Sequence, residues 1–227
     1  MGVQFLDDAA RAGFQAAVET VETASAVEVV IAVRRQSSRY LHANVIVGGV
    51  VAFAALAIML FAEASFGLAS ILVDPFVVGL AAGALVELAP GLKRILTPRG
   101  VRHAHVLQAA RAAFVERGVH NTRERSGLLV YISWLEQELA LVPDGGLAMA
   151  MDASTLAGIE SQLARAIRAG GGAVATALAG TASTFAASMP RAEDDVNELP
   201  DAIDSDLARH ERQAKRAARG AAPRGSA

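Results

Sequence analysis

Four side chains with hard oxygen atoms are closely spaced near the end of the chain: Asp195, Asn197, Glu198 and Asp201. Carboxylate and amide oxygens are the ligands that calcium or magnesium requires. The same stretch also fits a structural clamp, because Asp and Asn side chains accept hydrogen bonds from the backbone N–H groups of a turn. In that interpretation Leu199 fills the core and Pro200 fixes the exit of the chain. The spacing leaves both interpretations open.

The sequence gives little support for nucleophilic catalysis. No Ser-His-Asp or Cys-His arrangement is visible, and the chain has no cysteine, which excludes disulfides, thiolate zinc sites and a cysteine nucleophile. His103 and His105 are two residues apart, so on a helix they point in different directions and make a poor metal pair. The glycine triplet at 170–172 lacks the spacing and the lysine of a phosphate loop. The residue types therefore favour a divalent metal over a nucleophile.

Three stretches predict the strands that position these side chains. Residues 26–34 are dense in β-branched side chains and predict a strand that is buried on both faces. Glu28 is the acidic residue within it, and a carboxylate there must lie at a strand end, be paired or be functional. Residues 127–133 and 138–142 predict a β-hairpin whose turn is 134–137 and which ends at 143–146.

Helical periodicity accounts for most of the remaining soluble sequence. Apolar residues recur at helical spacing in 5–24 and 102–117, and Gly118 stops the second of these helices as a C-cap glycine does. Asp152 or Ser154 caps a further helix that the glycine triplet ends, and 174–189 predicts another. The order helix, strand, helix, two strands, helix, helix predicts an α/β layered domain with a small mixed sheet.

Two apolar stretches predict a transmembrane helical hairpin over residues 42–92. Residues 43–62 carry no charge and are long enough to cross the roughly 30 Å hydrocarbon layer. The second span is placed at about 72–92, with Asp74 and Pro75 at its start near the membrane surface and Glu87 at the opposite interface. Gly79 and Gly83 form a GxxxG pattern, which suits close packing of the hairpin or dimerisation.

The charges around the hairpin predict its orientation. Arginines precede the first span and Lys or Arg residues follow the second, whereas the connection at 63–74 has neither. By the positive-inside rule, we expect a bacterial inner-membrane protein with two spans and both termini in the cytoplasm. Residues 202–227 are expected to form a charged, disordered tail, whose basic part at 209–224 is a candidate for binding anionic lipid.

Four stretches, in this order, resemble the TPM-domain family, which includes thylakoid-lumen acid phosphatases, photosystem II repair proteins and a modulator of acetylcholine receptors. They are VEVVIAV at 27–33, the helix and loop at 109–127, the hairpin at 127–147 and DDVNELPD at 194–201. More specifically, the chain resembles a bacterial membrane-protein branch in which a transmembrane hairpin follows the first strand. The resemblance divides the TPM-like domain into residues 1–41 and 93–201.

The resemblance implies an αβα sandwich with acidic residues around a groove at one end of the sheet. Some members of the family bind calcium or another divalent ion there, and phosphatase activity has been attributed to certain members. By position, Glu28 matches the acid of the first strand, Asp144 matches the region after the third strand, and the four residues between 195 and 201 match the closing stretch. Since calcium takes 6 to 8 oxygens, that closing stretch would need help from Glu28, Asp144 or water.

Two functions therefore remain open from the sequence. The first is a binding and scaffolding module in which a cytoplasmic TPM-like domain contacts an unknown partner protein or senses Ca²⁺ or Mg²⁺. The second is a metal-assisted phosphatase, in which Asp195 or Glu198 holds the ion and a bound water attacks phosphorus. We expect membrane lipid to contact the hairpin, and we do not expect nucleic acid among the partners.

Overall fold

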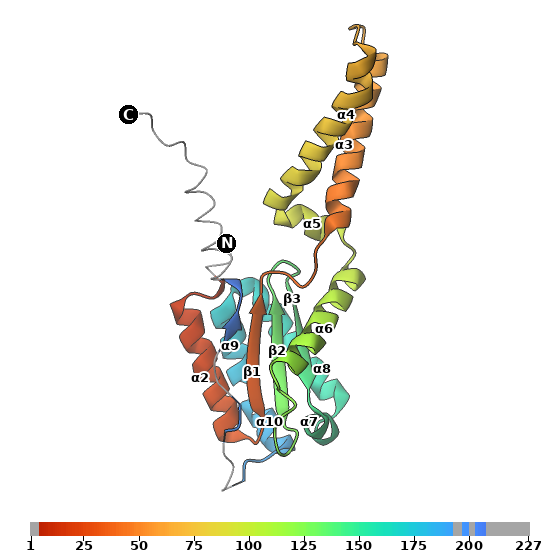
Figure 1. Ribbon diagram of the computed structural model, residues 1–227. Coiled ribbons are helices and arrows are strands. Elements are labelled where there is room, and N and C mark those ends of the chain that lie inside the picture. The colour runs from red at the N-terminus through yellow and green to blue at the C-terminus, as the bar shows by residue number, and fades with distance from the viewer. Residues whose placement is uncertain (1–4, 193–196, 200–202, 208–227) are drawn as a thin grey trace, which may run out of the picture. The chain divides into compact units, whose positions relative to one another are not determined.

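The computed structural model describes residues 5–192, 197–199 and 203–207. The chain forms two compact units, one made of Met1–Ser37 with His103–Ala227 and the other made of Ser38–Arg102. Figure 1 shows the sheet and most of the helices in the first unit and the two long apolar helices in the second. The predicted sites at Asp195 and Asp201, and the basic tail at 209–224, lie outside the described residues.

The first unit is built around a small mixed sheet. Its strands are β1 (Glu28–Arg34), β2 (Gly127–Ser133), β3 (Glu138–Pro143) and β4 (Asp204–Ser205), in the order β3-β2-β1-β4. β1 runs parallel to both β2 and β4, whereas β2 and β3 form the antiparallel hairpin. This arrangement confirms the predicted α/β fold with a mixed sheet.

Alternate residues of β1 contribute to two separate cores, because successive side chains of a strand point to opposite faces. Val29, Ile31 and Val33 belong to the larger core, and Val30 and Ala32 belong to the smaller one. All five are buried. The continuous apolar run in the sequence is therefore explained by helices on both faces of the sheet.

Helices cover both faces of the sheet (Figure 1). The larger core is closed by α2 (Asp8–Ala24), α8 (Ala153–Ala166), α9 (Gly171–Ala179) and α10 (Ala182–Ser188). The smaller core is closed by α6 (Arg99–Glu116), which lies in the connection between the parallel strands β1 and β2. A parallel pair needs a long crossover connection, and here that crossover also contains the apolar hairpin.

Local capping residues explain where several of these helices begin and end. The Asp7 carboxylate accepts a hydrogen bond from the Ala10 N–H (2.7 Å), and Asp152 caps α8 in the same way. α6 ends at Glu116, and Gly118 just beyond its end adopts the left-handed conformation with φ of 66°. The predicted cap at Asp152 and the predicted stop at Gly118 are thus both confirmed.

Two local features differ from the sequence-based expectation. The sequence pattern assigned no element to the stretch after the hairpin's end at 143–146, which forms the short helix α7 (Gly145–Ala150). The predicted single helix over 174–189 is two helices, because Gly180 and Thr181 interrupt it. Both the N–H (2.9 Å) and the hydroxyl (2.6 Å) of Thr181 donate to the Leu178 carbonyl, which tightens the end of α9.

Residues 203–207 return to the sheet, which corrects the expectation that the charged tail begins at 202. β4 pairs with β1 opposite Ala32 and Val33. The Asp204 carboxylate forms ion pairs with Arg34 and Arg117. The charged composition suggested a solvated tail, but here an acidic side chain is held by two cations at the edge of the sheet.

The second unit contains α3 (Leu41–Phe61), α4 (Leu68–Leu85), a 3₁₀-helix η1 (Val86–Leu88) and α5 (Pro90–Leu96). Two segments, Leu41–Phe61 and Leu68–Leu88, are long and apolar enough to cross a membrane. The second segment begins before the predicted start at 72 and ends before 92. Asp74 does not cap it, because the helix begins at Leu68 and Pro75 lies in its interior. Apolar residues ahead of this dipeptide extend the helix, and helices suited to membranes tolerate such prolines.

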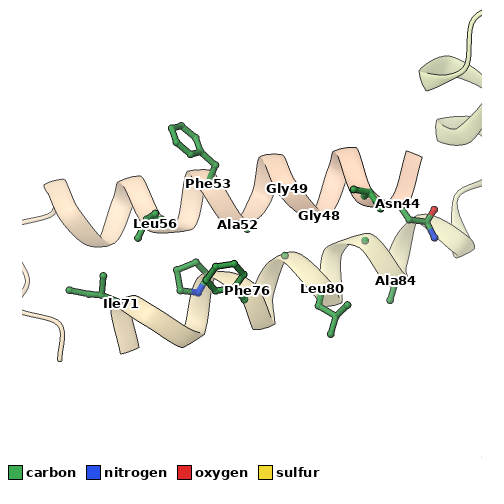
Figure 2. A pocket seen from close by; sticks show the side chains of 14 residues that line it. Asn44, Gly48, Gly49, Ala52, Phe53, Leu56, Ile71, Phe76, Leu80 and Ala84 are labelled. Carbon is green, nitrogen blue, oxygen red and sulfur yellow. The ribbon is translucent and has the colours of Figure 1, made fainter. Parts of the chain in front are cut away.

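Small residues allow α3 and α4 to approach closely. A Cβ added at Gly79 would lie 2.6 Å from the Gly48 carbonyl oxygen and 2.7 Å from Ala52 Cβ. A Cβ at Gly83 would lie 2.8 Å from the Asn44 carbonyl oxygen. Figure 2 shows the two helices side by side along an apolar groove of about 690 Å³. The GxxxG residues are therefore used for packing within the hairpin.

Candidate functional site

Glu28 is the first residue of β1, and its side chain lies at the end of the sheet. It is only 6% exposed. Its two carboxylate oxygens accept hydrogen bonds from the backbone N–H groups of Glu198 and Leu199, each at 3.3 Å. The acid within the first strand therefore holds part of the closing stretch.

Glu22 is a second buried carboxylate at this end of the sheet, and the sequence analysis did not select it. One of its oxygens accepts the Val29 N–H (3.0 Å) and the other accepts the Asn197 amide (2.9 Å). The Arg191 guanidinium donates to the Glu22 carbonyl oxygen at 2.6 Å. Glu22 follows Val18 by four residues, so it lies on the buried stripe of α2, and this spacing was the signal that could have identified it.

These groups line a polar cavity of about 290 Å³. Its walls come from α2, from the start of β1 and from the chain around residues 191 and 197; they are Gln15, Glu19, Glu22, Thr23, Glu28, Arg191 and Asn197. Carboxylate and amide oxygens of this kind suit a hard cation, while the Arg191 guanidinium suits an anion.

Glu198 and Leu199 hold the closing stretch to a different part of the domain. The Glu198 carboxylate accepts the Arg123 N–H at 2.7 Å. Leu199 packs against the smaller core, as the clamp interpretation predicted. In the described residues, this stretch therefore joins the start of β1 to the loop before β2.

Asp144 has a separate role. It caps α7 by accepting the Gly145 N–H (2.7 Å), and it forms an ion pair with Arg125 (2.9 Å). The hydrogen bond and the charge of Asp144 raise the pKa of Arg125. Asp144 follows β3, which is separated from β1 by β2, so at the usual strand spacing it lies about 10 Å from Glu28. The structure thus places Glu28, Asn197 and Glu198 in one region and Asp144 apart from them.

The structure does not describe Asp195 and Asp201, which complete the predicted ligand set. Within the described residues, no group of three or more His, Asp or Glu side chains is arranged to hold a metal ion. Glu22 and Glu28 nevertheless supply two carboxylates to one cavity, and Asn197 supplies an amide. These donors fit Ca²⁺ or Mg²⁺ chemically, and the remaining oxygens would come from other residues or water.

A buried polar network occupies the opposite end of the parallel strands. The Glu136 carboxylate accepts the Ser37 N–H (2.9 Å) and the Ser133 hydroxyl (2.5 Å). The Ser37 hydroxyl in turn donates to Ser133 (2.8 Å) and lies 3.3 Å from the Tyr131 hydroxyl. Burial raises the pKa of Tyr131. Ser133 is fully buried, so this network supports the structure and offers no accessible nucleophile.

Comparison with known structures identifies a protein of similar fold. The BA42 protein from the psychrophilic bacterium Bizionia argentinensis, solved by NMR, matches this chain with a TM-score of 0.54 and 11% sequence identity. The matched region covers 88% of this chain and 95% of BA42. The fold is similar to that of BA42. No family model matches the chain, and a search of curated proteins finds no match.

The match supports the α/β fold with a small mixed sheet that the sequence predicted. At this level of identity the likeness to BA42 concerns the fold alone.

Proposed function

We propose that the chain is an integral protein of the bacterial inner membrane whose TPM-like domain acts as a binding module in the cytoplasm. The observation that carries this proposal is the pair of long apolar helices inserted between β1 and β2. Their side chains are exposed along most of their length, including Val50 at 65%, Phe53 at 74% and Leu80 at 78%. A bilayer would remove this apolar surface from water.

The charge distribution supports the cytoplasmic orientation. Arg34, Arg35 and Arg39 precede α3, whereas Lys93 and Arg94 follow α4, and the connection between the helices has no Lys or Arg. Short segments rich in Lys or Arg stay on the cytoplasmic side during insertion. Both flanks of the hairpin, and with them both termini, are therefore assigned to the cytoplasm.

The polar cavity next to Glu28 supports the proposal that the TPM-like domain binds a ligand. The ligand we propose is a divalent ion, Ca²⁺ or Mg²⁺, whose binding would change how the domain holds a partner protein. Glu28 and Glu198 both accept backbone hydrogen bonds that connect separate segments. A cation at this end of the sheet would thus act on contacts that stabilise the closing stretch. This use of the acids favours a binding module over the alternative, a metal-assisted phosphatase.

The test combines topology in intact cells with metal binding and turnover measured on the full-length protein in detergent micelles. A reporter that fluoresces only in the cytoplasm, fused after Ala227, should be fluorescent. Calorimetric titration with calcium and magnesium should give binding that weakens at least tenfold in Glu28→Gln and in Asp195→Asn. Phosphomonoester hydrolysis should stay at background with either metal.

Each alternative has its own result. A periplasmic reporter would contradict the orientation. If both variants bound the metal as tightly as the wild type, the metal would not bind at this cavity. If the folded wild type bound no metal, only the partner-binding part of the proposal would stand. Metal-dependent turnover that is lost in Asp195→Asn would replace the binding module by the phosphatase.

A further inference from the structure

Side-chain hydrogen bonds hold the polar end of the hairpin together. The start of α3 and the end of the second apolar segment lie together, since the Asn44 amide donates to the Glu87 carboxylate at 2.7 Å. α5 folds back to the same level, where Lys93 donates to Glu87 at 2.6 Å. His42 and Thr97 are also hydrogen-bonded at 3.0 Å. These contacts bring the first turn of α3, η1 and α5 together at one end of the hairpin.

Positive charges outnumber negative charges at this end of the hairpin. Lys93 neutralises Glu87, which is the one acidic residue between Asp74 and Arg102. Arg39, Arg94 and Arg99 are exposed, and none of them forms an ion pair within the described residues. We call these three arginines the basic collar.

Arg102 provides a second observation beside the collar. It is 7% exposed, and its Nε atom has no hydrogen-bond partner in the described part of the chain. A buried guanidinium nitrogen without an acceptor is costly, so an acceptor from outside the chain would stabilise it. An anionic oxygen is the acceptor that a guanidinium prefers.

Exposed apolar side chains accompany the collar. Leu88 and Ile95 are each 79% exposed, and they flank the segment that carries Lys93 and Arg94. Apolar side chains next to cations are the composition that lies at the boundary between lipid headgroups and acyl chains. Water solvates the apolar side chains unfavourably, whereas at a membrane surface they contact acyl chains and the arginines contact headgroups.

We propose that the basic collar binds the phosphate groups of anionic phospholipids at the cytoplasmic surface. This inference rests on the proposed function, because it requires the hairpin to cross the membrane. The collar is distinct from the basic tail at 209–224, which was the lipid-binding segment expected from composition. Its arginines lie on segments held by the Glu87 and Thr97 contacts, so a headgroup meets charges in a defined arrangement.

The experiment measures which lipids surround the full-length protein in nanodiscs. Spin-labelled phosphatidylglycerol and spin-labelled phosphatidylcholine are compared by EPR, and the ratio of their association constants is the readout. Nanodiscs expose both faces of the bilayer, so the readout does not depend on the direction of insertion. The variants are R39Q/R94Q/R99Q, the charge-preserving R39K/R94K/R99K and a truncation after residue 207. The control is R165Q/R168Q, whose arginines lie in the last turn of α8 and in the 3₁₀-helix (Ile167–Ala169) that directly follows it.

The wild type should prefer phosphatidylglycerol, and the preference should weaken at high salt. Each charge near an anionic surface contributes about fivefold. The glutamine triple variant should therefore lose most of the preference, while the lysine variant, the truncated chain and the R165Q/R168Q control retain it. Loss of preference in the truncated chain with no change in the glutamine variant would overturn the proposal and assign lipid binding to the tail.

A separate measurement distinguishes failure of this proposal from failure of the proposed function. Membranes that contain the wild type are washed with alkaline carbonate, which releases proteins that do not span the bilayer. Release of the wild type would contradict the membrane hairpin itself. Retention, together with equal association of both lipids in the wild type, would overturn the basic collar alone.

Discussion

The carboxylate of Glu136 accepts a hydrogen bond from the backbone N–H of Ser37 at 2.9 Å. Ser37 is the last residue of the first unit before the chain enters the hairpin unit, and Glu136 lies in the turn between β2 and β3. The backbones are also joined here, since the Trp134 N–H donates to the Arg34 carbonyl and the Leu135 N–H to the Arg35 carbonyl, each at 2.9 Å. The parallel pairing of β1 and β2 thus continues to the point where the chain leaves the sheet.

Substitution of Glu136 by alanine should destabilise the sheet-containing unit. Glu136 is 1% exposed, and its removal would leave the Ser37 N–H and the Ser133 hydroxyl without their acceptor. The expected loss is about 2–6 kcal/mol of unfolding free energy, at about 1–3 kcal/mol for each of the two donors left without a partner. Urea unfolding followed by the fluorescence of Trp134, the single tryptophan, measures it.

Glu136→Gln should lose less than Glu136→Ala, because the amide keeps one acceptor oxygen. Glu124→Gln is a matched control, since Glu124 is exposed. If Glu136→Ala unfolded at the same urea concentration as the control, the network would contribute nothing to stability.

Substitution of Glu28 by alanine should loosen the closing stretch. The N–H groups of Glu198 and Leu199 would lose their acceptor, at an expected cost of about 1–3 kcal/mol. Limited proteolysis should then cut the chain faster near residues 190–200, while the rate of cleavage in the 120–127 loop rises less. Equal protection of this stretch in the variant and the wild type would show that Glu28 does not clamp it.

Gly79→Leu should separate α3 and α4, because even a Cβ at this position would lie 2.6 Å from the Gly48 carbonyl oxygen. The separation should move toward the about 8–10 Å between helix axes that is usual for larger side chains. Spin labels at Ile58→Cys and Leu72→Cys measure the change, since both positions are exposed and the chain has no other cysteine.

Gly49→Leu is the matched control for the hairpin, because nothing lies within 4 Å of a Cβ added there. It should leave the distance between the labels unchanged. If Gly49→Leu widened the hairpin as much as Gly79→Leu, the two helices would not pack through the GxxxG face.

Asp152→Asn should lower the thermal stability of the full-length protein near neutral pH and have no effect in strong acid. Hydrogen bonds from Ser154, and then from Thr155, lower the pKa of Asp152 from 3.8 to about 2. Because the folded pKa is depressed, the stabilisation is fully present above about pH 3.8 and is lost as the pH falls through about 2. Thermal unfolding of both proteins between pH 2 and pH 7 should show melting temperatures that converge in acid; a difference independent of pH would contradict the prediction.

Local patterns in the sequence were enough to predict most of the elements. The β-branched run before residue 34, the strand at 127–133 and the stop at Gly118 all depend on neighbouring residues, and the structure confirms each of them. The start of α4 was less predictable, because Asp74 and Pro75 have the composition of a helix start and yet lie within a helix.

Local sequence patterns predict only part of the candidate site. Glu28 could be selected because an acid is unusual in an apolar strand, whereas Glu22 could be found only from its position four residues after Val18 on the stripe of α2. Its partner Asn197 is 175 positions away in the chain, so no local pattern relates the two. The β4 pairing of Asp204 with β1 was missed for the same reason.

The sequence by itself determined the α/β pattern, the apolar hairpin and the small residues that pack it, because periodicity, length and side-chain size act over a few turns or one strand. Only the tertiary structure decided which acids meet at the end of the sheet, that Asp144 belongs to a helix cap, and that Glu136 holds Ser37. Those contacts join segments far apart in the chain. Their geometry depends on strand register and helix packing, which local composition does not specify.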